Sequence, residues 1–428
     1  MFSTIFREHL PDAAAPPAPL RPGGCRTAQG RTCPLCHAAR VEYEEEAAAR
    51  DAALRVFWRD LRVDAPLAPL VRSPLGRGYR TVSKRKVFPV KGEAQLGLID
   101  PGGEEGHRPV DVIDCPVEPA AHTAVYQRVR ESIRSGAGRH LVARLRYVIV
   151  KGNYREFVVI FSVARIDGAV VSAANMLSKT LTSACPGVRG VMLYEDRSDG
   201  RYYLGTQSPG SRGTVRKIFG ETTIYQKFGG KAFLFPPLAF SQVNASLVDR
   251  LIIEAGRMLG LGGEGDLYDL YCGYGLFTLT IGASARRGTG IERTPESIDA
   301  ALRNAGRIGG TNARFFRSDI TGTTLPRLLS RLGTADGVLL DPPRGGTAPG
   351  VIECIAARRP GRVVHMFCNV DIMQAEIARW KDSGYAVSRG VPFDMFPGTD
   401  DTEIMVLFTP GGGGGTQRTP PRGISRTR

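Results

Sequence analysis

Hydrophobic and polar residues follow two different rhythms along the chain, and the change falls near residue 228. Before that point, short β-branched or aromatic stretches broken by Gly, Asn and Asp predict strands, and two amphipathic stretches predict helices. The predicted strands are Arg144–Val150, Glu156–Val163 and Val188–Tyr194, and the predicted helices are Val41–Leu61 and Ala120–Ser135. We therefore expect an α+β region in the first half of the chain.

From residue 228 onward, apolar strands alternate with amphipathic helices. The expected strands are Leu267–Leu270, a stretch ending at Glu292, Gly337–Leu340 and Val363–Phe367, and the expected helices include Ser246–Leu259 and Pro295–Arg307. This alternation predicts an α/β fold with a doubly wound parallel sheet. In such a sheet the ligand binds at the carboxyl ends of the strands.

Composition suggests where the parts of the chain begin and end. Residues 1–24 are rich in Ala and Pro and predict a disordered tail. Residues 25–227 form the strand-rich region, residues 228–410 form the α/β domain, and residues 411–428 open with five glycines and predict a flexible tail. No internal repeat of 20–50 residues is present.

The charge balance indicates an anionic partner. The chain of 428 residues carries a formal net charge of +15, and Arg72 to Lys86 holds six basic residues and no acid. Tyr79 and Phe88 are interleaved with these cations, so the stretch is either a solvated face or a nucleic-acid contact. No apolar run is long enough for a membrane span, and eight cysteines are too sparse for a secreted disulfide scaffold. These features favour a soluble, cytoplasmic protein.

A glycine-containing loop follows the strand Leu267–Leu270. Asp269-Leu-Tyr-Cys-Gly273-Tyr-Gly275 leads into a helix, and Glu292 ends the next strand, where a carboxylate can accept from a ribose diol. Thr278 occupies the position of the third glycine in a dinucleotide fingerprint, and there is no phosphate-binding Gly-Lys-Ser/Thr loop. The pattern favours an adenosine ligand without a pyrophosphate, such as S-adenosylmethionine, over an ordinary strand-to-helix turn.

Three further polar groups fall at strand ends or starts. Asp341-Pro-Pro-Arg344 closes one strand, Cys368-Asn369 closes another, and Glu403 opens an apolar strand. A cysteine, a general base and a methyl donor are what methylation of carbon 5 of uracil requires. A thiolate that adds to carbon 6 makes carbon 5 nucleophilic, and a base later removes the carbon 5 proton. A base in folded RNA must also be flipped out.

With these motifs in view, residues 228 to 408 resemble the RNA (uracil-C5) methyltransferase family of the TrmA/RumA class. Five motifs carry the resemblance: Phe240-Ser-Gln242-Val-Asn244, Asp269-Leu-Tyr-Cys-Gly273, Asp341-Pro-Pro-Arg344, Cys368-Asn369 and Phe393-Asp-Met-Phe-Pro397 with Glu403. The resemblance implies a class I S-adenosylmethionine-dependent methyltransferase domain beside an RNA-binding region. It makes Cys368 the nucleophile and Glu403 the base, and it assigns cofactor contacts to Gln242, Tyr271, Glu292, Asp319 and Asp341.

The chain departs from the family pattern at two places. Phe367 and Val370 flank the Cys-Asn pair, where the family usually has Ser before it and Pro or Ala after it. Between the Phe-Pro turn and the base, the family tends to place two histidines, whereas this chain has residues 398–402, Gly-Thr-Asp-Asp-Thr. Both departures bear on how the uracil is positioned.

Four of the eight cysteines form a candidate metal site. Cys25, Cys33 and Cys36 are spaced Cys-x7-Cys-x2-Cys, and Cys115 precedes a proline. The spacing alone fits zinc or an iron–sulfur cluster. The resemblance implies a [4Fe-4S] cluster on these four residues and is closest to the RlmC-like 23S rRNA branch without a TRAM domain. We interpret the other three, Cys185, Cys272 and Cys354, as packing residues.

The leading hypothesis is thus an enzyme that forms 5-methyluridine in 23S rRNA. A tRNA 5-methyluridine methyltransferase and an RNA-binding factor on a catalytically retired scaffold are the alternatives, and a cytosine-C5 methyltransferase would need a Pro-Cys where Pro343-Arg344 stands. The sequence points to no obligate protein partner and to no membrane contact.

Overall fold

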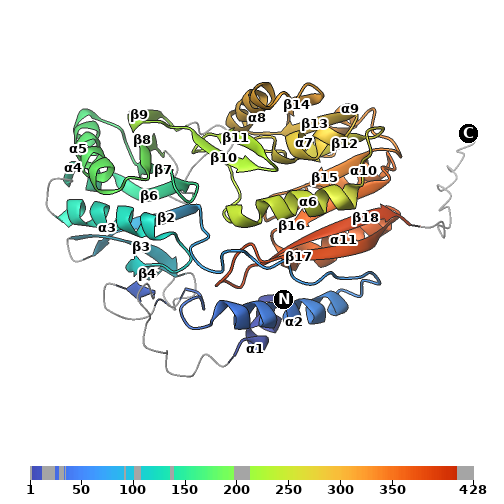
Figure 1. The fold of residues 1–428 in the computed structure, drawn as a ribbon, viewed down its shortest axis with the longest axis horizontal. Coiled ribbons are helices and arrows are strands. Elements are labelled where there is room, and N and C mark those ends of the chain that lie inside the picture. The colour runs from blue at the N-terminus through green and yellow to red at the C-terminus, as the bar shows by residue number, and fades with distance from the viewer. Residues whose placement is uncertain are drawn as a thin grey trace, which may run out of the picture.

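The computed structural model describes residues 2–11, 25–27, 33, 35–90, 93–100, 108–134, 139–196 and 213–411. Figure 1 shows two lobes side by side, with the N-terminal helices running beneath the C-terminal lobe. No helix in these ranges is long and apolar enough to cross a membrane. The predicted tail over 412–428 lies outside the described residues.

The N-terminal lobe is built on a seven-stranded sheet in the order β4-β3-β2-β6-β7-β8-β9. Its strands are β2 (Val82–Val90), β3 (Glu93–Asp100), β4 (Arg108–Val110), β6 (Leu145–Gly152), β7 (Phe157–Val163), β8 (Val188–Glu195) and β9 (Val215–Gly220). Helices α3 (Ala120–Arg134), α4 (Arg139–Val142) and α5 (Gly168–Ala184) accompany it. Every residue of β7 is buried, as expected for a β-branched strand in the middle of a sheet.

Helix α5 was not expected from the sequence. Asp167 caps it by accepting a hydrogen bond from the Val170 amide at 2.9 Å. Val170, Leu177 and Leu181 are buried and recur at helical spacing, so the helix packs one apolar stripe against the sheet. The prediction of a single helix between the strands of this lobe was therefore wrong.

The C-terminal lobe confirms the α/β prediction. Its sheet has the order β14-β13-β12-β15-β16-β18-β17 and comprises β12 (Asp266–Leu270), β13 (Arg287–Glu292), β14 (Ala313–Arg317), β15 (Gly337–Leu340), β16 (Arg362–Phe367), β17 (Tyr385–Phe393) and β18 (Glu403–Pro410). Helices α6 (Val248–Leu259), α7 (Leu276–Thr280), α8 (Pro295–Ile308), α9 (Leu325–Leu328), α10 (Val351–Ala356) and α11 (Met373–Asp382) connect the strands. The first five strands in this order are parallel.

The sheet is mixed rather than wholly parallel, which corrects the expectation. Strand β18 pairs antiparallel with both β16 and β17. As a result, the start of β18 lies at the same sheet edge as the carboxyl end of β16. The end of β17 and the start of β18, which face each other in the last hairpin, therefore both lie at this edge.

The N-terminus does not conform to the predicted disordered tail. Phe2–His9 forms helix α1, which packs on α2 (Tyr43–Asp60), and Phe2 and Phe6 are buried in this contact. The two rings lie four residues apart on one helix face, so a single stripe covers the apolar surface of α2. The remainder of the predicted tail, residues 12–24, lies outside the described residues.

A two-stranded hairpin joins the lobes. It consists of β10 (Ile224–Phe228) and β11 (Lys231–Phe235) and lies between the two sheets in Figure 1. One continuous apolar cluster includes Ile149 and Ile160 of the first sheet, Phe233 of the hairpin and Leu251 of α6. The lobes are therefore packed against each other through a shared core.

Candidate active site

The proposed nucleophile and base lie on neighbouring strands. Phe367 of β16 pairs with Ile404 of β18, so one further step in register places Cys368 opposite Glu403. Asp341 directly follows β15, the strand on the other side of β16. The fold therefore brings Cys368, Glu403 and Asp341 to one edge of the sheet, as the motifs predict.

Burial dominates the electrostatics of this edge. Glu403 is 2% exposed, and its Oε1 has no hydrogen-bond partner among the described residues. Desolvation raises the pKa of Glu403, and the nearby Asp341 carboxylate adds to the effect. Desolvation likewise raises the pKa of Asp341. A buried carboxylate with an unpaired oxygen is poised to accept a proton from a ligand.

The Cys368 thiol is held in its neutral form when no ligand is bound. Burial, followed by the Glu403 and Asp341 carboxylates, raises its pKa to about 12, while the Arg344 guanidinium acts in the opposite direction. Its sulfur lies 3.9 Å from the carbonyl oxygen of Pro342. Attack by this sulfur must therefore be accompanied by loss of the thiol proton to an acceptor.

Gln242 reaches the site from outside the sheet. Its Nε2 donates to Asp341 Oδ2 at 3.3 Å. The N-terminal lobe holds the loop that carries it, because the Thr81 amide donates to Val243 O at 2.9 Å and the buried Lys151 ammonium donates to Ala239 O. Both lobes are thus needed to place Gln242.

The glycine loop has the features of a nucleoside cradle. The Glu292 carboxylate accepts from the amides of Gly273 at 3.3 Å and Thr294 at 2.7 Å, which fixes it beside the loop. Tyr271 adopts a left-handed backbone (φ 67°), and a Cβ placed on Gly273 would meet no described atom within 4 Å. The loop therefore faces open space, and Glu292 and Tyr271 fit the adenosine part of S-adenosylmethionine.

Thr278 has a structural reason to replace the third glycine. Its amide and hydroxyl donate to the buried Asp269 Oδ2 at 2.8 and 2.6 Å, and these bonds anchor the first turn of α7 beneath the loop. Desolvation nevertheless raises the pKa of Asp269 to about 7. Thr278 thus has a role in anchoring the helix, and its presence does not point to a ligand with a pyrophosphate.

The remaining predicted site residues differ in their surroundings. Asp319 follows β14 at the same sheet edge, but its side chain is exposed and lies 3.9 Å from Arg293. Asn369, next to the nucleophile, donates to Arg344 O at 3.1 Å and accepts from the Asp371 amide at 3.3 Å. It therefore fixes the turn after β16. Cys185 and Cys272 are buried, and Cys354 is half-buried.

Two residues of α2 that the sequence did not single out support the base. Arg50 is fully buried and donates to the carbonyls of Thr399 at 2.6 Å and Asp401 at 2.7 Å. Glu46 accepts from the Gly398 amide at 2.6 Å. Arg50 also pairs with Glu46 at 3.0 Å and with the buried Asp394 at 3.3 Å. We call Glu46 and Arg50 the α2 brace; it holds the segment over 394–402, which leads into Glu403.

The segment over 398–402 contains no histidine, but His37 lies against it. His37, from a different part of the chain, lies 3.2 Å from Glu46 Oε1 and 3.7 Å from Asp400 Oδ1, and its amide donates to Gly398 O. An imidazole thus contacts this segment even though the segment contains none. The sequence predicts a helix around Arg50, but nothing in its pattern indicates these distant contacts.

The four predicted ligand cysteines gather in one place. Strand β1 (Arg26–Thr27) pairs with β5 (Val112–Asp114), which brings Cys25 beside Cys115. Cys25, Cys33 and Cys115 share an apolar cluster with Val112, and Cys36 packs against Cys115 in a second cluster. Thiols drawn from three segments in this way have the softness that iron–sulfur clusters and zinc require.

Their present arrangement is not a ligand shell. A hydrogen bond between the Cys25 and Cys33 thiols lowers the pKa of Cys33 to about 7 and raises that of Cys25. Within the described ranges, no group of three or more His, Cys, Asp or Glu side chains could hold a metal ion. The donor chemistry fits a cluster, whereas closer approach of the four sulfurs would be needed to bind one.

Part of the basic stretch over residues 72–86 forms ion pairs within the protein. Arg72, Arg77 and Arg85 form ion pairs with Glu44, Glu46 and Glu118, respectively, and Arg85 is 1% exposed. Tyr79 is fully buried. Arg77 and Arg85 therefore neutralise buried acids, whereas Arg72 and Lys84 stay exposed, so only part of the stretch is left for a solvated face or a nucleic-acid contact.

Comparison with known proteins shows similarity to RNA methyltransferases. Residues 227–410 match the model of the tRNA (Uracil-5-)-methyltransferase family. An RNA methyltransferase of Thermotoga maritima is 27% identical over 391 residues, covering 89% of this chain and 83% of the relative. The 23S rRNA (uracil(1939)-C(5))-methyltransferase RlmD of Klebsiella pneumoniae is 31% identical over 300 residues, which is 70% of this chain and 63% of that protein.

A solved structure shares the whole architecture. The tRNA (uracil-54, C5)-methyltransferase of Pyrococcus abyssi, in complex with S-adenosyl-L-homocysteine, superposes with a TM-score of 0.64 at 21% identity and covers 89% of this chain and 87% of its own. At that identity the likeness shows the fold. The fold and the site define an α/β methyltransferase that uses S-adenosylmethionine. More specifically, residues 227–410 of the chain resemble the tRNA (Uracil-5-)-methyltransferase family.

Proposed function

We propose that this enzyme forms 5-methyluridine in 23S rRNA by covalent catalysis, with Cys368 as nucleophile and Glu403 as base. The carrying observation is the antiparallel pairing of β16 and β18, which sets Cys368 opposite Glu403 beside Asp341. Base flipping is needed for the target to reach this buried edge. A ribosomal RNA substrate also agrees with the cytoplasmic location expected from the sequence.

In the proposed reaction the Cys368 sulfur bonds to carbon 6 of uracil as the thiol proton passes to a water molecule. The electron pair of the carbon 5–carbon 6 double bond becomes an enolate, and carbon 5 takes the methyl group. S-adenosylmethionine supplies that methyl group. Arg344 favours the thiolate form, while Gln242 and Asp341, already in contact, would hold the polar edge of the flipped base or of the methyl donor.

Glu403 acts in the second half of the reaction. Its carboxylate removes the proton from carbon 5, the double bond re-forms, and the bond between carbon 6 and the Cys368 sulfur breaks. The unpaired Oε1 supports this role because no described donor competes for it. Tyr271 and Glu292, with Asp319 at the same edge, would bind the adenosine moiety.

Two variants test the covalent mechanism. Cys368→Ala should abolish methyl transfer to RNA, whereas Cys354→Ala, at a half-buried cysteine outside this edge, should leave it unchanged. Glu403→Gln should accumulate a methylated RNA–protein adduct that survives denaturing gel electrophoresis. Normal turnover by Cys368→Ala would refute the mechanism, and RNA binding by the wild-type protein without methyl transfer would favour the retired-scaffold alternative.

The choice of RNA needs a separate measurement. Nucleoside mass spectrometry of 23S rRNA and tRNA, from cells with and without the gene, should show 5-methyluridine missing from 23S rRNA alone. Loss from tRNA alone would reject the rRNA assignment and favour the tRNA alternative.

We further propose that Cys25, Cys33, Cys36 and Cys115 hold a [4Fe-4S] cluster, as in the RlmC-like branch. Support comes from the pairing of β1 with β5, which joins Cys25 to Cys115, and from the shared cluster of thiols. A cluster bound there would supply a structural link between these segments. Anaerobically purified protein should be brown with broad absorbance near about 400 nm, and Cys115→Ser should be colourless. Colourless wild-type protein with stoichiometric zinc would reject the cluster.

A further inference from the structure

The structure places exposed aromatic and basic side chains together at the junction of the lobes. On β9, the outward face carries Val215, Lys217 and Phe219, and on β10 it carries Tyr225 and Lys227. Phe219 is 43% exposed and Tyr225 is 45% exposed. Large apolar rings at such exposure, alternating with cations along a strand, call for a ligand that offers both flat faces and negative charge.

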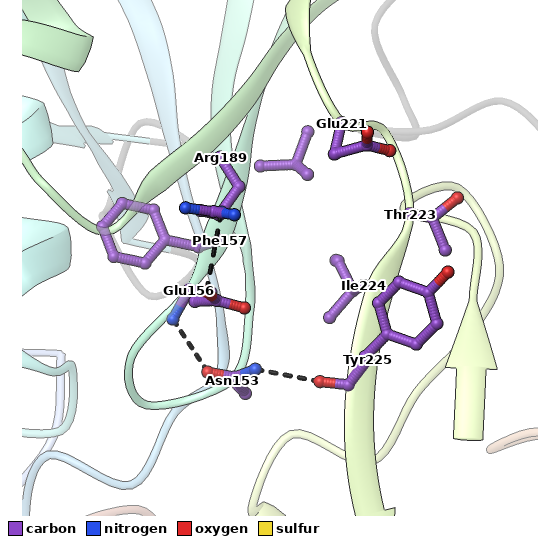
Figure 2. Close-up of a pocket in the computed structure, with 9 residues that line it drawn as sticks. Asn153, Glu156, Phe157, Arg189, Glu221, Thr223, Ile224 and Tyr225 are labelled. Carbon is purple, nitrogen blue, oxygen red and sulfur yellow. Dashed lines mark hydrogen bonds and ion pairs between the residues drawn. The ribbon is translucent and has the colours of Figure 1, made fainter. Parts of the chain in front are cut away.

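A hollow lies beside this strand. Figure 2 shows Asn153, Glu156 and Arg189 of the N-terminal lobe facing Tyr225 and Thr223 of the hairpin strand across it. Asn153 fixes its width, because its Nδ2 donates to Tyr225 O at 2.9 Å while its Oδ1 accepts from the Glu156 amide at 2.8 Å. A second hollow continues along Tyr154, Arg155, Tyr225, Gln226 and Lys227.

The Tyr225 ring is oriented for stacking. The Arg307 guanidinium of α8 lies 5.2 Å from its centroid, a cation–π contact that holds the ring from the side of the C-terminal lobe. Ile224 and Phe228 are buried on the opposite face of β10, so the strand cannot rotate to hide Tyr225. The ring is therefore presented as a rigid platform.

Charge selects the partner. The segment over 215–231 has four basic residues, Arg216, Lys217, Lys227 and Lys231, against the single acid Glu221. Arg155 and Arg189 lie across the hollows, and Arg189 is tied to Glu156 at 3.5 Å. Excess positive charge beside exposed rings favours single-stranded nucleic acid, because its bases stack on the rings and its phosphates pair with the cations.

We infer that β9, β10 and the adjoining hollows form a second RNA-contact surface, which we call the hairpin surface. It would bind an unpaired nucleotide outside the methylation target by stacking a base on Tyr225 and placing its phosphates at Lys227 and Arg155. The inference rests on the proposed RNA substrate. Strand β11 leads from this surface to the loop of Gln242, so the same stretch of chain links the bound RNA to the active site.

Binding of a fluorescein-labelled 20-nucleotide oligouridine tests the hairpin surface. Tyr225→Ala should weaken binding at least about fivefold, as expected for one lost stacked base, and Tyr225→Phe should bind within twofold of wild type. Lys227→Ala should lower the slope of log K against log salt by about 0.7, as expected for one lost phosphate contact. Phe316→Ala, at a 42% exposed ring on β14, is the matched control and should change nothing.

Methylation of 23S rRNA transcribed in vitro separates this surface from the catalytic machinery. Tyr225→Ala should raise KM with kcat retained at saturating RNA, because Tyr225 touches none of the proposed catalytic residues. Wild-type affinity and KM for both Tyr225→Ala and Lys227→Ala, in a wild-type enzyme that methylates RNA, would overturn the inference. A partner protein lost from the variants at unchanged RNA affinity would also overturn it. Failure of the wild-type enzyme to methylate RNA would instead refute the proposed function.

Discussion

Replacement of Arg50 is expected to impair the base step as well as stability. In Arg50→Ala, the buried carboxylates of Glu46 and Asp394 lose a shared cation, and the carbonyls of Thr399 and Asp401 lose their donor. Breaking a buried ion pair costs about 3–5 kcal/mol. Against a total unfolding free energy of about 5–15 kcal/mol, that is a large share.

Arg50→Lys is the more informative variant. It keeps the positive charge, but one ammonium on a flexible stem cannot reproduce the fork that reaches the carbonyls of Thr399 and Asp401 together. We expect a loss of about 1–2 kcal/mol for the missing charged hydrogen bond. Asp401 lies two residues before Glu403, so a small shift of the segment should slow adduct breakdown by about 10²-fold.

Two measurements on the same variants separate the effects. Guanidinium unfolding gives the change in stability, and single-turnover methylation followed by denaturing gels gives the fraction of RNA held as adduct. Arg55→Ala on the same helix is the control, because its ion pair with Asp51 is exposed and worth at most about 1 kcal/mol. Wild-type stability and turnover in Arg50→Lys would refute the α2 brace. Lost stability without adduct accumulation would reduce it to a purely structural role.

Three further outcomes are expected. Glu292→Ala should weaken S-adenosylmethionine binding about 10- to 100-fold by calorimetry, because the carboxylate that anchors the Gly273 amide is lost; unchanged affinity would remove Glu292 from the site. Because burial raises the pKa of Glu403 to about 8, adduct breakdown should still be rising with pH at neutrality, and a rate already level above about pH 5 would contradict this. Thr278→Val should lower the unfolding free energy by about 1–3 kcal/mol in chemical denaturation, since the buried Asp269 carboxylate loses a donor; an unchanged midpoint would argue against that anchor.

The sequence indicates those parts of the site that lie at strand ends. Cys368, Asp341 and Glu292 each follow an apolar stretch whose strand character is evident, so their convergence at one edge follows from the parallel sheet. Glu403 also reaches this edge, although it opens its strand rather than closing one. That placement depends on β18 being antiparallel, which no local pattern specifies.

Long-range contacts account for what the sequence did not reveal. The bond from Arg50 to Asp401 spans 351 residues, and no local spacing encodes it. The same holds for Arg85, which lies in a basic stretch typical of a surface but neutralises the buried Glu118. Helix α5 is a different case, because Asp167 and the spacing of Val170, Leu177 and Leu181 were visible but lay among β-branched residues.

The register of β18 fixes the position of Glu403, whereas part of the segment before β18 is held only through its backbone. Side chains on a strand alternate between faces, so a slip of a single residue would turn Glu403 away from Cys368 and move each apolar residue that follows it to the opposite face of the sheet, against the wrong core. In the segment before β18, the α2 brace holds Gly398, Thr399 and Asp401 through backbone groups, whereas it holds Asp394 through its side chain. The side chains of Thr399 and Asp401 can therefore change while the reacting atoms keep their spacing. Substitutions that adapt the enzyme to a different RNA, in nature or in the laboratory, are therefore best tolerated at these positions.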